Sequence, residues 1–264
     1  MDTDLRKGLV PVPGELPTFA SAGLEARAVE IGRRAAGSYT YLAGLLDLRP
    51  EAQVLVLNEA DWGSRTDIQL YGLPNADHGT LVVAGAEAPF WAEFGVQPDE
   101  AGRAELAAVY GRPDGSLAFA PFFDLIAVHE VAHLFHFHEG RVIFPRLWLQ
   151  EFFANLCLHA YVERREPAAL ETLLTLPRVA ARAPATAFEY RTRDEFERMY
   201  SGMSGPNYAW FQFRLQLEAA ELFRSGGEAT VRRLYDAFRV DDSELSAHLT
   251  DTVDPGLGAF ALQF

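Results

Sequence analysis

The sequence contains a single cysteine, Cys157, among 264 residues. One thiol cannot form an internal disulfide, so cross-links do not hold this fold together, and Cys157 is expected to be a small buried residue. Positive charge is also scarce, because 23 Lys and Arg face 37 Asp and Glu and leave a net charge of −14. Such an acidic chain should repel phosphate backbones and anionic lipids, so we expect neither a nucleic acid nor a membrane surface as a partner.

Long apolar runs are missing as well. No run approaches the roughly 18 apolar residues that are needed to span a bilayer. The first residues, Met-Asp-Thr-Asp-Leu-Arg-Lys-Gly, do not combine a basic segment with an apolar one as a signal peptide does. We therefore expect a cytoplasmic protein. With 49% hydrophobic residues, the chain can bury a substantial core.

The hydrophobic pattern changes near Pro121. Residues 1–20 carry three prolines and little periodicity, which indicates an extended arm. Residues 21–121 mix short β-rich runs with helical patterns, and residues 122–264 are almost entirely helical in pattern. The prediction is an α+β fold with a mixed N-terminal lobe that holds a small sheet and a mostly helical C-terminal lobe, forming one compact catalytic unit.

Local signals predict individual elements. Helices are expected over residues 24–46, with a break at Gly37, and over residues 99–110. Strands are expected over residues 54–57, 68–71, 80–83 and 116–119. Residues 75–79 are expected to form a turn. Further N-caps are predicted at Asp99, Asp124, Thr192 and Asn207, and helix ends at Gly140, before Pro167 and at Gly226-Gly227.

The segment His129-Glu130-Val131-Ala132-His133 has the form H-E-x-x-H. Residues four apart lie on one face of a helix, so His129 and His133 can both reach one metal ion. Glu130 lies about 100° around the helix from His129, where it can hold a water molecule without being a ligand. Two imidazoles and a third ligand leave one position of a zinc ion open, as catalytic sites require.

Glu151 is the candidate third ligand. It is separated from His133 by 17 residues, which allows a turn and a second helix that crosses the first. Its sequence neighbours are apolar, so its carboxylate is expected in an apolar wall, where metal binding would offset the cost of burying its charge. The alternative is an ordinary solvated helix charge.

Two motifs together resemble the gluzincin superfamily of zinc metallopeptidases, the thermolysin-like and aminopeptidase-like group. They are His129-Glu130-x-x-His133 and Trp148-Leu149-x-Glu151-x-x-Ala154, and the second is similar to the W-L-x-E-G-x-A segment of the aminopeptidase branch. Phe152 stands where that branch has glycine. The resemblance covers about residues 120–215 and implies a thermolysin-like architecture with a Zn²⁺ cofactor. It also implies a peptide or protein substrate, which is hydrolysed by a metal-activated water with Glu130 as the general base.

The resemblance also implies further site residues. Asn155 takes the place of an aspartate that orients the first histidine in thermolysin-like enzymes, although it could equally be an ordinary helix residue. Tyr208 corresponds to a tyrosine that donates to the transition state in the aminopeptidase branch. Tyr200 is the alternative donor, and His248 is a remoter one by analogy with the histidine of thermolysin-like enzymes.

Other interpretations remain open at this point. The metzincin pattern needs glycine at 136 and histidine at 139, but the chain has His136 and Glu139, so His136 and His138 are not expected to be ligands. The same ligand set would suit a zinc hydrolase of another amide or an ester. Because Phe152 and Asn155 depart from the family pattern, a catalytically inactive binding or regulatory protein with a zinc site is a third candidate.

Overall fold

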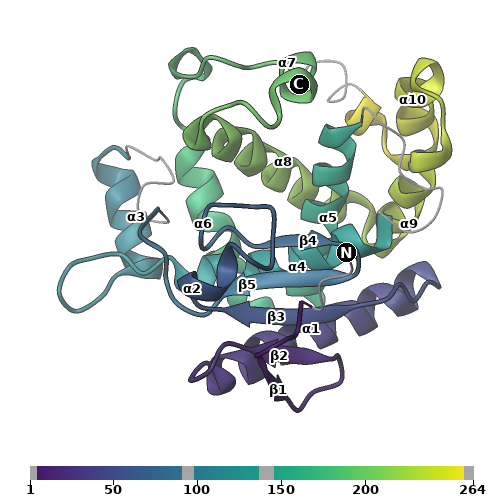
Figure 1. Cartoon of the computed structure of the whole chain (residues 1–264). Helices are drawn as coiled ribbons and strands as arrows, with labels where there is room; N and C mark the ends of the chain where they lie inside the picture. Colours follow the sequence, from purple (N-terminus) through teal and green to yellow (C-terminus); the bar gives the residue numbers. More distant parts are fainter. Residues whose placement is uncertain (1–4, 91–97, 137–145, 259–264) are drawn as a thin grey trace. The chain divides into compact units, whose positions relative to one another are not determined.

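A computed structural model describes residues 5–90, 98–136 and 146–258. The chain forms two compact units (Figure 1). The first contains Met1–Trp91 and Phe119–Phe135, and the second contains Ala92–Ala118 and His136–Phe264. The predicted boundary at residue 121 therefore differs from the observed division, since residues 92–118 join the helical unit and most of the motif helix joins the sheet-bearing one.

The first unit contains a five-stranded mixed sheet in the order β1-β2-β3-β5-β4, so the prediction of an α+β fold with a small sheet is confirmed (Figure 1). Its strands are β1 Val10–Val12, β2 Thr18–Ala20, β3 Gln53–Leu57, β4 Asn75–Asp77 and β5 Thr80–Ala84. The inner strands β2, β3 and β5 are parallel, whereas β1 and β4 pair antiparallel at the two edges. The expected strands at 54–57 and 80–83 are thus confirmed, and both are buried.

The predicted N-terminal arm is wrong, because residues 1–20 supply two strands of this sheet. Proline normally disrupts a sheet since it has no N–H to donate. Pro11, however, lies in the edge strand β1, where only one side of the strand is paired. Its missing donor is tolerated there, so the prolines do not exclude this segment from the sheet.

Three other local predictions also fail in this unit. Helix α1 (Glu25–Leu46) runs through Gly37 without a break. Residues 68–71 form no strand, and Trp62 of α2 (Glu59–Trp62) donates its Nε1–H to the carbonyl of Ile68 at 2.6 Å. The expected turn at 75–79 is shorter, since it starts after β4, and His78 and Gly79 adopt φ values of 42° and 77° that reverse the chain into β5.

The second unit is helical in the part that the structure describes. Its helices are α3 Glu100–Tyr110, α5 Leu147–Arg165, α6 Leu170–Ala180, α7 Arg193–Met199, α8 Gly205–Gly226, α9 Glu228–Asp236 and α10 Asp242–His248. Helix α5 forms the centre of the unit, because every residue from Trp148 to Val162 is buried. Residues 116–119 do not form the predicted strand and show one isolated bridge, between Gly111 and Leu117.

The predicted helix caps divide into two groups. Asp99 accepts from the N–H of Gly102 at 2.7 Å, and Thr192 forms a capping box with Glu195, so both predictions are confirmed. Asp124 and Asn207 instead lie inside helices, the first in α4 (Ala120–His136) and the second in α8. The ends of α5 before Pro167 and of α8 at Gly226 are confirmed, while Gly140 falls outside the described residues.

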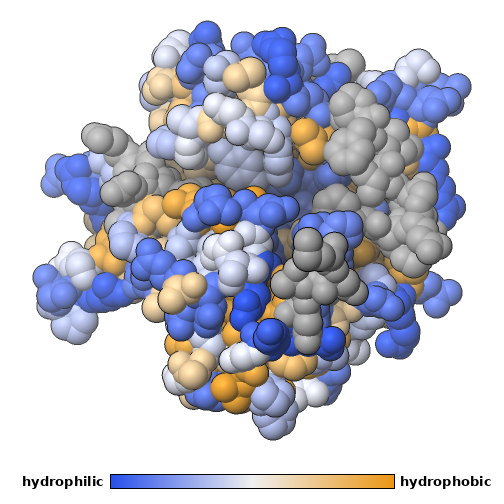
Figure 2. Space-filling model, in the orientation of Figure 1, coloured by the Kyte–Doolittle hydropathy of each residue, from blue (hydrophilic) through white to orange (hydrophobic). Residues whose placement is uncertain are grey.

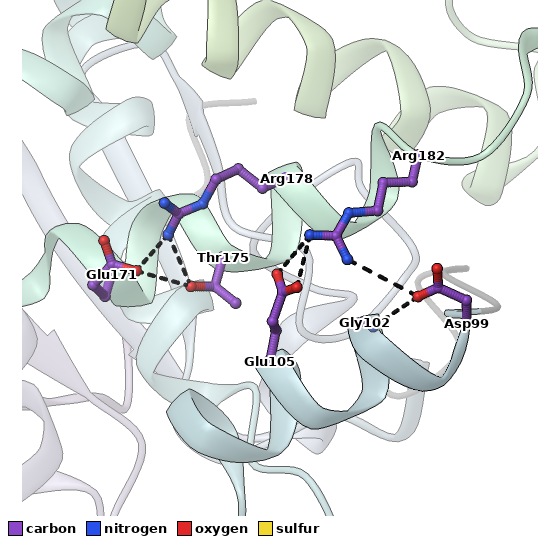
Figure 3. A network of polar contacts seen from close by, with 7 residues as sticks. All are labelled: Asp99, Gly102, Glu105, Glu171, Thr175, Arg178 and Arg182. Carbon is purple, nitrogen blue, oxygen red and sulfur yellow. Dashed lines mark hydrogen bonds and ion pairs between the residues drawn. The ribbon is translucent and has the colours of Figure 1, made fainter.

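Ion pairs join α3 to the residues that follow α6 (Figure 3). Arg182, two residues after the end of α6, contacts the carboxylate of Glu105 at 2.7 Å and that of Asp99 at 3.9 Å. These side chains are all more than two-fifths exposed, so each pair contributes little by itself. Beneath them, the buried Tyr110 donates its hydroxyl to the carbonyl of Thr172, and burial raises the pKa of this phenol.

The coloured part of the face drawn in Figure 2 is mostly hydrophilic, with scattered apolar residues. The large hydrophobic side chains that are exposed among the described residues are Val29, Ile68 and Leu70. No helix in the described ranges is long and apolar enough to cross a membrane.

Candidate metal centre

The helix that carries the H-E-x-x-H motif, α4, is held against α1 on both sides of the motif. Before it, Arg27 of α1 forms two parallel hydrogen bonds with the carboxylate of Asp124, one of them 2.8 Å long. After it, the ring of Phe135 packs 5.5 Å from the ring of Tyr39. The hydrogen bonds with Asp124 raise the pKa of the Arg27 guanidinium. The predicted N-cap at Asp124 is therefore wrong, because its carboxylate serves a tertiary ion pair.

The two histidines of the motif present the same ring nitrogen to each other. Their Nε2 atoms are 3.0 Å apart, and both side chains are buried. Two imidazole nitrogens bound tetrahedrally to zinc at about 2.0–2.1 Å would be about 3.3–3.4 Å apart. A separation of 3.0 Å therefore fits a shared metal ion after a shift of a few tenths of an ångström. The predicted convergence of His129 and His133 is confirmed as geometry.

Glu130 completes this group. Ligand atoms of His129, Glu130 and His133 all lie within 4.8 Å of one another, and all three residues are buried. A carboxylate at this distance can reach a water molecule held between itself and the histidines. These buried nitrogen and oxygen donors can therefore hold a metal ion, and their chemistry is compatible with zinc.

Glu151 belongs to the second unit, where it is buried on α5 at 3% exposure. Tyr200 donates its hydroxyl to Oε1 at 2.6 Å, and Gln212 of α8 donates its Nε2–H to Oε2 at 2.7 Å. The predicted burial of this helix by its apolar residues is confirmed by the complete burial of Phe152 and Phe153. The solvated-charge alternative is wrong for this carboxylate, since Glu151 is buried and accepts hydrogen bonds from Tyr200 and Gln212.

Both candidate tyrosines lie in this same cluster. The hydroxyl of Tyr208 accepts from Nε2 of Gln212 at 2.8 Å, and the rings of Tyr200 and Tyr208 are 5.7 Å apart. Burial raises the pKa of Tyr200 well above its usual value, and the charge of Glu151 and hydrogen bonds to Glu151 and Tyr208 add to this shift. Tyr200 is therefore a neutral phenol that donates. The third candidate, His248, ends α10, and no contact between it and this cluster is seen among the described residues.

Asn155 makes its hydrogen bonds through its amide nitrogen. Nδ2 donates to the backbone carbonyl of Glu151 at 3.0 Å and to Oε1 of Gln212 at 2.9 Å. Both partners lie in the second unit, and neither is an imidazole. The predicted role of Asn155 in orienting a histidine stays a prediction, whereas its part in the Glu151 cluster is observed.

Sequence reasoning missed Gln212 and Glu197. The N-cap residue of α5, Arg146, makes no side-chain cap, and Glu197 of α7 instead accepts from the N–H groups of Leu147 and Trp148 at 3.0 and 2.8 Å. Glu197 thus fixes the start of the helix that presents Glu151. Its distance in sequence hides this role, but the spacing of four between Tyr208 and Gln212 could have pointed to a shared polar face on α8.

His136 and His159 fill packing positions, whereas His78 is exposed in the turn before β5. His136 is fully buried in the second unit, with its ring 5.5 Å from that of Phe238, so it is not a surface residue. His159 is also buried, its Nε2 lies 3.1 Å from the carboxylate of Glu163, and burial lowers its pKa. His138 falls outside the described residues.

Comparisons of the chain with models of protein families, with curated proteins and with solved structures find no match. The features of this chain that point to a function are therefore its motif, the geometry of α4 and the hydrogen bonds around Glu151.

Proposed function

We propose that this protein is a zinc-dependent metallopeptidase in which His129, His133 and Glu151 hold the metal ion. The observation that carries the proposal is the pair of Nε2 atoms 3.0 Å apart with the buried carboxylate of Glu130 beside them. Glu151 enters through its spacing in the sequence, its resemblance to the third ligand of gluzincins, and its burial as a hydrogen-bonded carboxylate.

In the proposed mechanism, a bound zinc ion would polarise the scissile carbonyl and lower the pKa of water. Glu130 accepts the proton of the attacking water and transfers it to the departing amine. Tyr208 donates a hydrogen bond to the developing oxyanion. Tyr200 and Gln212 keep the Glu151 carboxylate in place, as hydrogen-bonding partners of metal ligands commonly do.

The sheet suggests how an extended substrate binds. Strand β5 has no free edge for a substrate, because it already pairs with β3 and β4, and residues 116–119 form no strand. Strand β4 is the edge of the sheet. We therefore infer that a peptide adds to the outer edge of β4 through main-chain hydrogen bonds. A mixed sheet followed by the motif helix supports a thermolysin-like arrangement of the first unit.

The decisive variant is Glu130→Gln. It keeps the size of the side chain but removes the base, so zinc should still bind in a 1:1 ratio while hydrolysis falls by about 10²–10⁴-fold. Zinc content by atomic emission and turnover of a mixed peptide library measure the two effects. Retained turnover would refute the mechanism, and wild-type protein that hydrolyses small amides or esters but no peptide would refute the substrate class.

A further inference from the structure

We propose that Asn155 and Gln212 form an orientation relay, a pair of positioning residues that sets the carboxylate of Glu151 for metal binding. The metal-binding role of Glu151 rests on the proposed function. The relay itself rests on contacts within the second unit, between neighbouring turns of α5 and α8.

The direction of every hydrogen bond in the relay follows from two groups that can only accept. A backbone carbonyl cannot donate, so Asn155 must present Nδ2 to the carbonyl of Glu151 at 3.0 Å. An ionised carboxylate cannot donate either, so Gln212 must present Nε2 to Oε2 of Glu151 at 2.7 Å. The one remaining contact then joins the Asn155 nitrogen to the Gln212 oxygen at 2.9 Å, which is a donor facing an acceptor.

These contacts use both protons of both amides. Gln212 gives its second N–H to the hydroxyl of Tyr208 at 2.8 Å. Tyr200 donates its one hydroxyl proton to Oε1 of Glu151 at 2.6 Å. The two oxygens of Glu151 are therefore approached by fixed donors, and Asn155 determines which end of the Gln212 amide faces them.

Aspartate at position 155 would reverse this order. Its carboxylate cannot donate to the Glu151 carbonyl or to the Gln212 oxygen, and it would attract the Gln212 NH₂ group instead. The Gln212 oxygen would then face the carboxylate of Glu151, and a second negative charge would lie nearby. Asn155→Asp should thus weaken metal binding here. If residue 155 instead orients a histidine, as the resemblance implies, the same change adds full charge to that hydrogen bond and strengthens binding.

The two interpretations predict opposite changes in zinc affinity for Asn155→Asp, so one measurement distinguishes them. Zinc dissociation constants are measured on the full chain by competition with a chromophoric chelator, and the cobalt(II) absorption spectrum reports ligand geometry. Asn155→Asp and Gln212→Met should each raise the zinc dissociation constant about 10–100-fold and alter the cobalt spectrum. The control is Gln216→Met, one turn further along α8, because Gln216 is a buried glutamine on the same helix whose amide has no hydrogen-bond partner among the described residues. Equal or tighter binding by Asn155→Asp, or equal losses in the two methionine variants, overturns the relay.

Failure of the relay can be separated from failure of the proposed function. Glu151→Gln should itself lose zinc affinity, and an unchanged affinity would remove Glu151 from the ligand set whatever the relay does. The relay is then decided in metal-free protein by NMR, where the Gln212 side-chain amide protons should exchange slowly in the wild type and fast in Asn155→Asp. Slow exchange in both proteins refutes it. If Asn155→Asp does not fold, as judged by circular dichroism, Gln212→Met carries the same decision through zinc affinity.

Discussion

Breaking the ion pair between Arg27 and Asp124 should destabilise the attachment of the motif helix α4 to α1. The two side chains are only 22% and 16% exposed and make two parallel hydrogen bonds. A hydrogen bond to a charged group contributes about 1.5–3 kcal/mol, and partial exposure lowers the total by screening. We therefore expect Arg27→Ala and Asp124→Ala each to lower the free energy of unfolding, with a coupling energy of about 2 kcal/mol between them.

The assay is a double-mutant cycle of urea unfolding at pH 7. Glu30→Ala is the control, because its carboxylate lies 3.9 Å from the same guanidinium but is 70% exposed, so its coupling to Arg27 should stay below about 0.5 kcal/mol. If Asp124 acted as a helix N-cap, Asp124→Ala would cost about 1 kcal/mol whether or not Arg27 is present. A coupling energy near zero would therefore refute the ion-pair interpretation.

Two further predictions concern buried groups of α5. Burial lowers the pKa of His159 below 6.5, so its neutral form stabilises the fold above pH 6.5, and this contribution is lost as the pH falls through the lowered pKa. His159→Gln should reduce the acid-side slope of unfolding free energy against pH by at most about 1.4 kcal/mol per pH unit, and identical slopes would contradict this. Burial also raises the pKa of the Cys157 thiol, so a thiol reagent should label native protein only at the rate of unfolding, and rapid labelling at neutral pH would contradict it.

Two of the three inner strands, β3 and β5, were predictable, whereas β2 and the two edge strands were not. Strands β3 and β5 are continuous apolar runs that are buried on both faces, so their composition alone indicates them. Strands β1 and β4 have three residues each and contain proline or turn-forming residues. They exist because β2 and β5 offer backbone partners, and pairing with a distant segment leaves little trace in local sequence.

Helix starts follow the same division between local and distant partners. Asp99 and Thr192 cap helices through backbone groups three residues away, and the sequence pattern contains that spacing. Asp124 meets Arg27, which lies 97 positions away, and Asn207 bonds the backbone N–H and carbonyl of Tyr190, both at 2.9 Å. A cap-forming residue with a better tertiary partner does not cap, and no local signal reveals that competition.

The candidate site shows the same limit. His129, Glu130 and His133 lie within about one turn of one helix, so their spacing alone predicts that they converge. Gln212 lies 61 positions from Glu151, and glutamine has no pattern that marks a carboxylate partner. The hydrogen-bonded surroundings of Glu151 therefore emerge only from the packing of α5 beside α8.

The two departures from the gluzincin pattern can now be weighed as arguments for an inactive site. Phe152 follows Glu151 in sequence, so its side chain points about 100° away from Glu151 around α5. It is fully buried, and the centroid of its ring lies 6.5 Å from that of Trp148. Asn155 supports Glu151 through Gln212, a task that the family's aspartate could not perform in this cluster. Both departures thus belong to the packing and hydrogen bonding of α5, and neither removes a group that the proposed reaction needs. The case for an inactive protein must therefore come from wild-type protein that binds zinc but hydrolyses no peptide, amide or ester, and not from these two residues.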